Sequence, residues 1–352
     1  MSGDPVVLFG RQIDVGEVPL VVAELSANHR QDLQTAIDSV RVAAESGADV
    51  VKFQHFSTNS ITVRGEHKDL RIGQDGLWSG RILADLYDEA FMPWEWTSTL
   101  SSVAKDHGIS WFSSPFDRMA IDFLVDQGVE ALKIASFELV DIPLIRHAAS
   151  TGLPIVISTG MASTEEIDSA VDAAHDVGNR NVILLRCNSS YPARTDELDL
   201  AAITDMRERW SLPVGLSDHT LSETSAVVAT ALGACMIEKH FTVDRSLGGP
   251  DAAFSLEPYQ LRRLVESVNE AHSALGSVRY GPSPSELSSL QFRRSLRTLR
   301  EIKKGEVITV ENVGSRRPSG GLPPESLTDH IGKRVVRTLV SGAPLLASDV
   351  ES

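Results

Sequence analysis

Polar and ionisable side chains recur directly after short apolar runs along the chain. Eight such runs each pass into residue types that can transfer a proton, hold an anion or bind a metal. In sequence order, these residues are Glu24; Lys52 and Gln54; Ser113 and Ser114; Lys133 and Ser136; Ser158 and Thr159; Asn188; Ser217, Asp218 and His219; and Glu238, Lys239 and His240. The repetition predicts one active site that is assembled from eight separate elements.

Two histidines, His219 and His240, follow the last two of these runs. If the runs are neighbouring strands, the imidazoles can meet, and together with water they suit a borderline divalent ion such as Mn²⁺ or Zn²⁺. Such a site leaves coordination positions open for a substrate. Histidines that cap helices or bond to the backbone are the common alternative.

Two lysines, Lys52 and Lys133, end the second and fourth runs, and short hydroxyl or amide side chains end several others. Together they predict a site for a compact polyanion, such as a phosphate ester that also carries a carboxylate. The predicted anion-binding residues are Lys52, Ser114, Lys133, Ser136, Ser158, Asn188 and Ser217.

Two carboxylates, Glu24 and Glu238, end the first and last runs, which are neighbours if the sheet closes. Either carboxylate can act as a general base or orient a metal-bound water. A salt bridge to a neighbouring lysine is the alternative interpretation.

The elements that must position these residues alternate between strand and helix. The apolar runs cover 20–24, 49–53, 109–112, 131–135, 154–158, 182–187, 213–216 and 235–238, with amphipathic stretches between them. This alternation predicts an α/β chain with a (β/α)8 TIM barrel, in which the carboxyl ends of the strands converge on one mouth. A long connection over 55–93 is predicted to overhang that mouth.

Length and charge limit the remaining organisation. The 352 residues exceed the roughly 250 of a typical barrel, so we predict a barrel over 1–276, a linker over 277–292 and a small β-rich domain over 293–352. Two β-runs are expected in that domain, at 307–310 and 335–340. The net charge of −15 argues against nucleic-acid and membrane partners. With no long apolar run and no export signal, a cytoplasmic location is expected.

Several segments also resemble the motifs of a known family. AELSANH (23–29), VKFQ (51–54), FSSPFD (112–117), LKIASFELVDIPLI (132–145), ISTGMA (157–162), LLRCNSSYPA (184–193), GLSDHT (215–220) and IEKHFTVDRS (237–246) are similar to strand-end motifs of the sialic acid synthase family. Residues 293–352 resemble that family's antifreeze-like (SAF) domain. Within the family, the runs at 76–96 and 248–258 are more similar to pseudaminic acid synthases than to N-acetylneuraminate synthases.

The resemblance implies an activity and a set of roles. Members condense phosphoenolpyruvate with an amino-sugar aldose, which gives a nine-carbon 2-keto acid and phosphate. It implies that His219 and His240 bind a divalent metal, with Mn²⁺ expected ahead of Mg²⁺ or Co²⁺. The anion-binding residues would hold phosphoenolpyruvate, and the catalytic set would be Glu24, Lys52, Glu238, His219 and His240. Sugar contacts are implied for Gln54, Tyr191, Asp251, Phe254 and Arg317, the last from a neighbouring subunit in a domain-swapped homodimer.

Departures from the family pattern leave the sugar open. Arg30, His55 and Phe56 replace residues that the family usually carries, and all three are predicted to face the sugar side. Arg297 also replaces an expected Tyr. The candidate sugars belong to the pseudaminate, legionaminate or N-acetylneuraminate series, or to the high-carbon sugars of a secondary pathway. A catalytically silent sugar-binding barrel is the alternative from another class.

Overall fold

A computed structural model describes residues 6–13, 16–73 and 76–351 of the chain. The chain divides into two compact units, Met1–Gly276 and Ser277–Ser352. Each unit has its own hydrophobic core.

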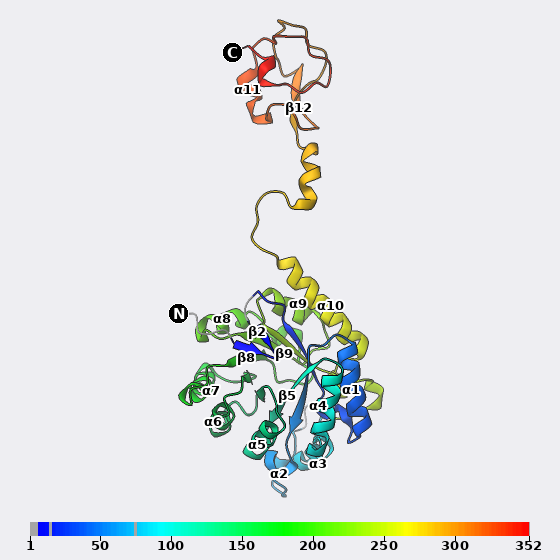
Figure 1. Ribbon diagram of the computed structural model, residues 1–352, viewed down its shortest axis with the longest axis vertical. Coiled ribbons are helices and arrows are strands. Elements are labelled where there is room, and N and C mark those ends of the chain that lie inside the picture. The colour runs from blue at the N-terminus through cyan, green and yellow to red at the C-terminus, as the bar shows by residue number, and fades with distance from the viewer. Residues whose placement is uncertain (1–5, 14–15, 74–75, 352) are drawn as a thin grey trace. The chain divides into compact units, whose positions relative to one another are not determined.

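The first unit is a closed barrel of eight parallel strands, which confirms the predicted TIM barrel (Figure 1). The strands are β3 (Leu20–Glu24), β4 (Val50–His55), β5 (Ser110–Pro115), β6 (Leu132–Ile134), β7 (Ile155–Ser158), β8 (Val182–Cys187), β9 (Val214–Asp218) and β10 (Met236–His240). The barrel closes where β10 pairs with β3, in a register that sets His240 opposite Glu24. Nearly all strand residues are buried because side chains fill the barrel on one face and helices cover the other.

Helices surround the barrel, and most of them follow one strand and precede the next. They are α1 (Leu33–Glu45), α4 (Thr97–Asp106), α5 (Arg118–Asp126), α6 (Ile142–Ser150), α7 (Thr164–Asp176), α8 (Ala202–Trp210), α9 (Thr224–Ala231) and α10 (Pro258–Leu275). Side chains of Asp32, Asp117, Asp141 and Ser163 accept backbone N–H bonds at four of the helix starts. Such caps fix where each helix begins and therefore where the preceding strand must end.

An antiparallel hairpin, β1 (Val6–Leu8) and β2 (Arg11–Ile13), precedes the barrel and was not predicted. Val6, Leu8 and Ile13 belong to the barrel core. Arg11 pairs with Asp49 at 3.0 Å, just before β4 begins. The hairpin therefore packs against the amino-terminal end of the barrel, opposite the mouth.

The long connection after β4 contains more structure than its composition suggested. It holds α2 (Thr58–Ile61), a 3-10 turn at Lys68–Leu70, α3 (Leu83–Ala90) and a second turn at Trp94–Trp96. Other short 3-10 turns are Ser26–His29, Thr195–Glu197, Arg245–Leu247 and Ala252–Phe254. We call residues 56–90 the lid segment.

The second unit is small and largely irregular. It contains a 3-10 helix at Pro284–Phe292, the strands β11 (Ser295–Thr298) and β12 (Val313–Arg316), a turn at Pro324–Ser326, α11 (Leu327–His330) and a turn at Ala347–Asp349. The β-runs predicted at 307–310 and 335–340 were wrong as strands, since they form only isolated bridges such as Val307 to Arg334 and Val335 to Val350. Ile308, Val335 and Leu339 are apolar because they fill this unit's core, not because they lie in a sheet.

In the described part of the chain, no helix has the length and apolar character to cross a membrane.

Candidate active site

Four charged side chains meet inside the barrel at the carboxyl ends of β3, β4, β6 and β10. Lys52 Nζ lies 2.6 Å from Glu24 Oε2 and 3.7 Å from Glu238 Oε1. Lys133 Nζ donates to both oxygens of Glu238 at 3.0 Å. All four side chains are at most 4 % exposed. The salt bridges considered as an alternative for the two glutamates are therefore present.

Burial and charge displace the pKa values of this cluster in different directions. Burial, reinforced by Glu238, raises the pKa of Glu24 to about 7 although Lys52 opposes the shift. Burial also acts to raise the pKa of Glu238, but Lys133 and Lys52 outweigh it and the net direction is down. Burial lowers the pKa of Lys133 against the opposing charge of Glu238. Glu24 is therefore the carboxyl of this cluster that can exchange a proton near neutral pH.

Two of the four predicted hydroxyl groups bond to these charged side chains. Ser114 Oγ accepts a hydrogen bond from Lys52 Nζ at 3.2 Å, and Ser217 Oγ donates to Glu238 Oε1 at 3.3 Å. Ser136 bonds to Ser189 at 2.8 Å. Ser158 Oγ is buried with no hydrogen-bond partner among the described residues. A buried hydroxyl of this kind is available to a ligand.

Asn188 differs from the other predicted anion-binding residues. Its side-chain amide donates to the carbonyl of Glu197 at 3.0 Å and its Oδ1 accepts from the N–H of Ser190 at 2.9 Å. The amide is thus engaged in holding the loop after β8. The backbone carbonyl of Asn188 instead accepts a bond from His219 Nδ1 at 2.7 Å.

The two histidines lie together, with ring centroids 5.3 Å apart. Because His219 Nδ1 donates to a carbonyl, its Nε2 carries the free lone pair. His240 Nδ1 is buried and has no hydrogen-bond partner in the described part of the chain. Burial lowers the pKa of His219 to about 4, and burial together with the nearby His219 lowers that of His240 as well. Both rings are therefore neutral at pH 7, the form that binds a metal.

This pair fits a divalent metal with an open coordination sphere. The described residues contain no group of three His, Cys, Asp or Glu side chains arranged to hold an ion. Water or substrate oxygens would therefore complete the coordination of an ion held by two imidazole nitrogens. The carbonyl of Asn188 fixes the tautomer of His219, as the outer bond to a metal-binding histidine would.

A cavity of about 530 Å³ opens beside His240. Its polar lining comes from the barrel mouth and consists of Ser26, Gln54, Ser136, Glu138, Tyr191, His240 and Asp251. Its apolar lining comes mainly from the lid segment and includes Phe56, Ile61, Ile72, Leu83, Leu86 and Tyr87. The predicted position of the long connection over the mouth is thus confirmed, and the cavity has one polar and one apolar side.

Three of the predicted sugar-side residues, Tyr191, Phe254 and Asp251, lie against the histidines, and Gln54 lies against Glu24. The Tyr191 ring lies 4.3 Å from that of His219, and the Phe254 ring lies 4.8 Å from that of His240. Gln54 Nε2 donates to Glu24 Oε1 at 2.8 Å. Asp251 Oδ2 lies 3.8 Å from His240 Nδ1. Arg317 belongs to the second unit, so its role stays a prediction.

Three cavity residues were missed by the sequence reasoning. Trp78 packs its ring 5.5 Å from that of Tyr191 and donates to the carbonyl of Pro250 at 2.9 Å. Ser26 bonds to Asp251. Glu138 has a buried Oε2 without a hydrogen-bond partner among described residues, and burial raises its pKa to about 7. Glu138 lies two residues beyond Ser136, and this position after a barrel strand was the signal that could have identified it.

The departures from the family pattern lie in different environments. His55 does not face the sugar side, and that expectation was wrong. Strand alternation turns it outward, where its ring bonds to Ser113 at 2.6 Å and Thr97 at 2.7 Å. Phe56 does line the cavity, whereas Arg30 is exposed and is not among the lining residues.

Arg297, the fourth departure, bonds to several backbone carbonyls of the second unit. Its guanidinium donates to the carbonyls of Pro318, Ser319 and Gly342. It therefore holds together separate segments of the second unit, including the residues that directly follow Arg317.

Comparison with known proteins agrees with this arrangement. The model of the NeuB family matches residues 39–280, and the SAF domain model matches residues 293–351. The chain belongs to the NeuB family. The resemblance to sialic acid synthases and the predicted SAF domain are both confirmed.

Relatives of this NeuB chain span nearly its whole length. A pseudaminic acid synthase of Campylobacter jejuni is 38 % identical over 94 % of this chain and 96 % of the relative. An N,N'-diacetyllegionaminic acid synthase of Legionella pneumophila is 36 % identical over 94 % of each. The crystal structure of an N-acetylneuraminic acid synthetase from Leptospira borgpetersenii, solved with citrate, superposes with a TM-score of 0.72 at 32 % identity, covering 82 % of this chain and 95 % of that one.

Proposed function

We propose that this protein condenses phosphoenolpyruvate with 2,4-diacetamido-2,4,6-trideoxy-L-altrose and water, which gives pseudaminic acid and phosphate. The observation that carries the reaction type is the cluster of two buried lysines, two buried glutamates and two neutral histidines at one barrel mouth. Such a set supplies cations for an anionic substrate, a base and a metal-binding pair at one place. A binding-only barrel needs no such set.

The anionic substrate would bind at the lysines. Lys52 and Lys133 would hold the phosphate and carboxylate of phosphoenolpyruvate, with Ser114, Ser136, Ser158 and Ser217 donating further hydrogen bonds and Asn188 shaping the adjacent loop. Their burial excludes water, so each contact is stronger than it would be on the surface.

The sugar aldehyde would lie across the histidines. A divalent metal on His219 and His240, Mn²⁺ in our proposal, would supply Lewis-acid polarisation of the aldehyde oxygen. Carbon C3 of phosphoenolpyruvate then bonds to the aldehyde carbon, whose oxygen takes up a proton. Positive charge develops at C2 beside Glu24 and Glu238, whose carboxylates would stabilise it.

Glu24 is proposed to accept a proton from the water that adds to C2. The C2–O bond to the phosphate then breaks, phosphate leaves with that oxygen, and loss of the hydroxyl proton leaves the 2-keto acid. Gln54 donates to Glu24 at 2.8 Å and holds the carboxyl in position for this step. The pKa of Glu24, about 7, suits proton transfer at neutral pH.

The cavity supports the choice of sugar. The described residues that line it include no lysine or arginine, so it offers nothing to pair with a sugar phosphate. The apolar side formed by Phe56, Ile61, Ile72 and Leu83 suits methyl groups of N-acetyl and deoxy positions better than a row of hydroxyl groups. This favours a trideoxy diacetamido sugar over N-acetylmannosamine.

We further propose that two chains form a domain-swapped homodimer in the cytoplasm. Met119, Phe137, Val140 and Met161 all follow the carboxyl ends of barrel strands and are all exposed. Apolar side chains gathered at one end of a barrel are suited to contact with a partner. We propose that a second copy covers them and that its Arg317 contacts the sugar. The cytoplasm is where phosphoenolpyruvate is made.

The test is phosphate release from phosphoenolpyruvate with Mn²⁺ and each of three sugars: the trideoxy diacetamido altrose, its legionaminate-type isomer and N-acetylmannosamine. Mass spectrometry would identify the keto acid. Release with the altrose alone supports the proposal. Release with another sugar keeps the reaction and changes the product. Release with none of the three, while a sugar still binds without metal, favours the binding-only barrel.

A further inference from the structure

A second buried ion pair lies directly behind the two histidines, on the outer face of the barrel. Lys239 Nζ lies 2.7 Å from Asp218 Oδ2, and the two side chains are 1 % and 0 % exposed. The residues are register partners across β9 and β10, and each directly precedes one histidine in the sequence. Because strand residues alternate in direction, Lys239 faces away from the cavity that His240 lines, and its partner Asp218 lies on the same outer face.

The pair holds the backbone that follows His219. Lys239 Nζ donates to the carbonyl of Thr220 at 2.6 Å and to that of Ser222 at 3.0 Å. Asp218 Oδ1 accepts from the N–H of Thr220 at 2.8 Å, and its Oδ2 accepts from Ser225 in α9. The backbone after His219 is therefore bonded to the ion pair in two ways: its carbonyls accept from Lys239, and one of its N–H groups donates to Asp218.

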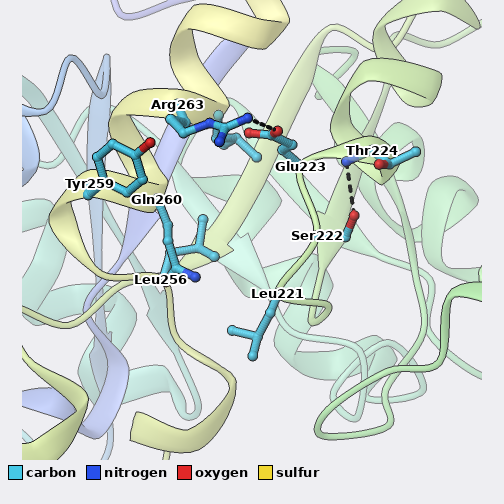
Figure 2. A pocket seen from close by; sticks show the side chains of 9 residues that line it. Leu221, Ser222, Glu223, Thr224, Leu256, Tyr259, Gln260 and Arg263 are labelled. Atoms are coloured by element: carbon cyan, nitrogen blue, oxygen red, sulfur yellow. Dashed lines mark hydrogen bonds and ion pairs between the residues drawn. The ribbon is translucent and has the colours of Figure 1, made fainter.

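The outer side of the same loop borders an open space. Figure 2 shows Leu221, Ser222, Glu223 and Thr224 along one wall of a cavity of about 330 Å³, with Arg263 of α10 opposite and bonded to Glu223 at 2.6 Å. With a cavity on that side, packing alone leaves the loop poorly constrained. The bonds to Lys239 and Asp218 supply the constraint from within the barrel wall.

Stability alone gives little reason to bury this pair. Charges removed from water lose about as much solvation as they gain from each other, and apolar residues of similar size would serve a fold equally well. The geometry points to a different use. We propose that Lys239 and Asp218 are positioning residues that set His219 and His240 at the spacing needed to bind the metal. This inference rests on the metal role that the proposed function gives these histidines.

The experiment measures binding of Mn²⁺ alone, without substrates, by the electron paramagnetic resonance signal of free Mn²⁺. The full-length wild type is compared with Lys239→Met and Lys239→Arg. Arg11→Met is the control, since Arg11 pairs with Asp49 at 3.0 Å and Asp49 likewise accepts a backbone N–H, that of Val21, at 2.8 Å, but at the opposite end of the barrel. Circular dichroism checks the fold of each variant.

Loss of a direct outer contact to a metal ligand weakens metal binding by about 10- to 100-fold. Because Lys239 acts on His219 through the backbone that follows it, we expect Lys239→Met to weaken Mn²⁺ binding by about 10-fold, the lower end of that range. Arg11→Met should bind as the wild type does, and Lys239→Arg should recover part of the loss. If Lys239→Met does not fold, Asp218→Asn, which keeps the side-chain shape, should show the weakened binding in its place.

Three results would contradict this inference, and each has a different meaning. Wild-type affinity in folded Lys239→Met, or in Asp218→Asn when it stands in, overturns the positioning role and leaves the proposed function intact. An equal loss in Arg11→Met also overturns it, since the effect would then be general. A wild-type protein that binds no Mn²⁺ overturns both this inference and the metal role of the histidines.

Discussion

Replacing Glu24 with Gln removes a carboxyl group that titrates close to neutral pH. Burial raises its pKa from 4.5 to about 7, which means that ionising it inside the barrel costs about 3 kcal/mol more than in water at about 1.4 kcal/mol per tenfold change. A base with this pKa is about half ionised at pH 7, about one tenth at pH 6 and about nine tenths at pH 8.

The expected pH dependence follows from these fractions. A raised carboxyl pKa leaves the group protonated at low pH, so the wild-type kcat/KM should rise about tenfold between pH 6 and pH 8 and then level off. Glu24→Gln keeps an oxygen for the Gln54 bond but has no base. Its kcat/KM should fall by about 10²- to 10⁴-fold, and the rise with pH should disappear. Phosphate release between pH 5.5 and 9 measures both.

Glu138 provides the necessary control, because burial raises its pKa to about 7 as well and it lines the same cavity. Glu138→Gln should keep the rise with pH, whatever its effect on sugar binding. If Glu24→Gln retains the rise and Glu138→Gln loses it, the assignment of the base to Glu24 is wrong and Glu138 replaces it.

Three other predictions follow from contacts in the site. His219→Ala or His240→Ala should abolish Mn²⁺-dependent phosphate release, and normal turnover in either variant would remove that histidine as an essential ligand. Lys133→Met leaves Glu238 without its closest cation and should lower the free energy of unfolding by about 3–5 kcal/mol in urea titrations, with Lys133→Arg less affected. Trp78→Ala removes a ring packed on Tyr191 and should raise the KM for the sugar several-fold while leaving that for phosphoenolpyruvate unchanged; equal changes in both would contradict its place on the sugar side.

The sequence was sufficient to predict the barrel because its strands are apolar on both faces and are separated by helix-length stretches. The same pattern also located Glu24, Lys52, Lys133, Glu238, His219 and His240, since all of them lie at or just beyond the carboxyl end of an apolar run, where the barrel mouth forms. The hairpin β1–β2 was not predicted, because strands of three residues are too short to show the alternation of apolar and polar residues that identifies a strand. In the second unit, apolar residues such as Ile308 fill a core without a sheet, so alternation there did not indicate strands.

The sequence could not predict which side chains bond to one another. The outward direction of His55 depends on where β4 begins and ends, and its bonds to Ser113 and Thr97 join elements that are far apart along the chain. The side-chain amide of Asn188 was expected to face an anion but bonds to its own loop, a short-range competition typical of Asn. The pairing of both lysines with both glutamates required the closed barrel, which brings β10 beside β3.

The mutual pairing of Lys52, Lys133, Glu24 and Glu238 has a consequence for how an anion enters. The two glutamates act as counter-ions of the two lysines in the free site, and because Glu24 is about half ionised at pH 7 they cancel most, but not all, of the positive charge. A multiply charged anion that binds to the lysines must therefore replace their contacts with the glutamates. The buried carboxylates are then left without a counter-ion. Protonation of one glutamate removes this uncompensated charge at the lowest cost in free energy. Glu24 is the glutamate that protonates more readily, since its pKa is about 7. Arrival of the anion is thereby linked to uptake of a proton from solvent, and the proton that Glu24 gains must leave again before that carboxylate can act as a base.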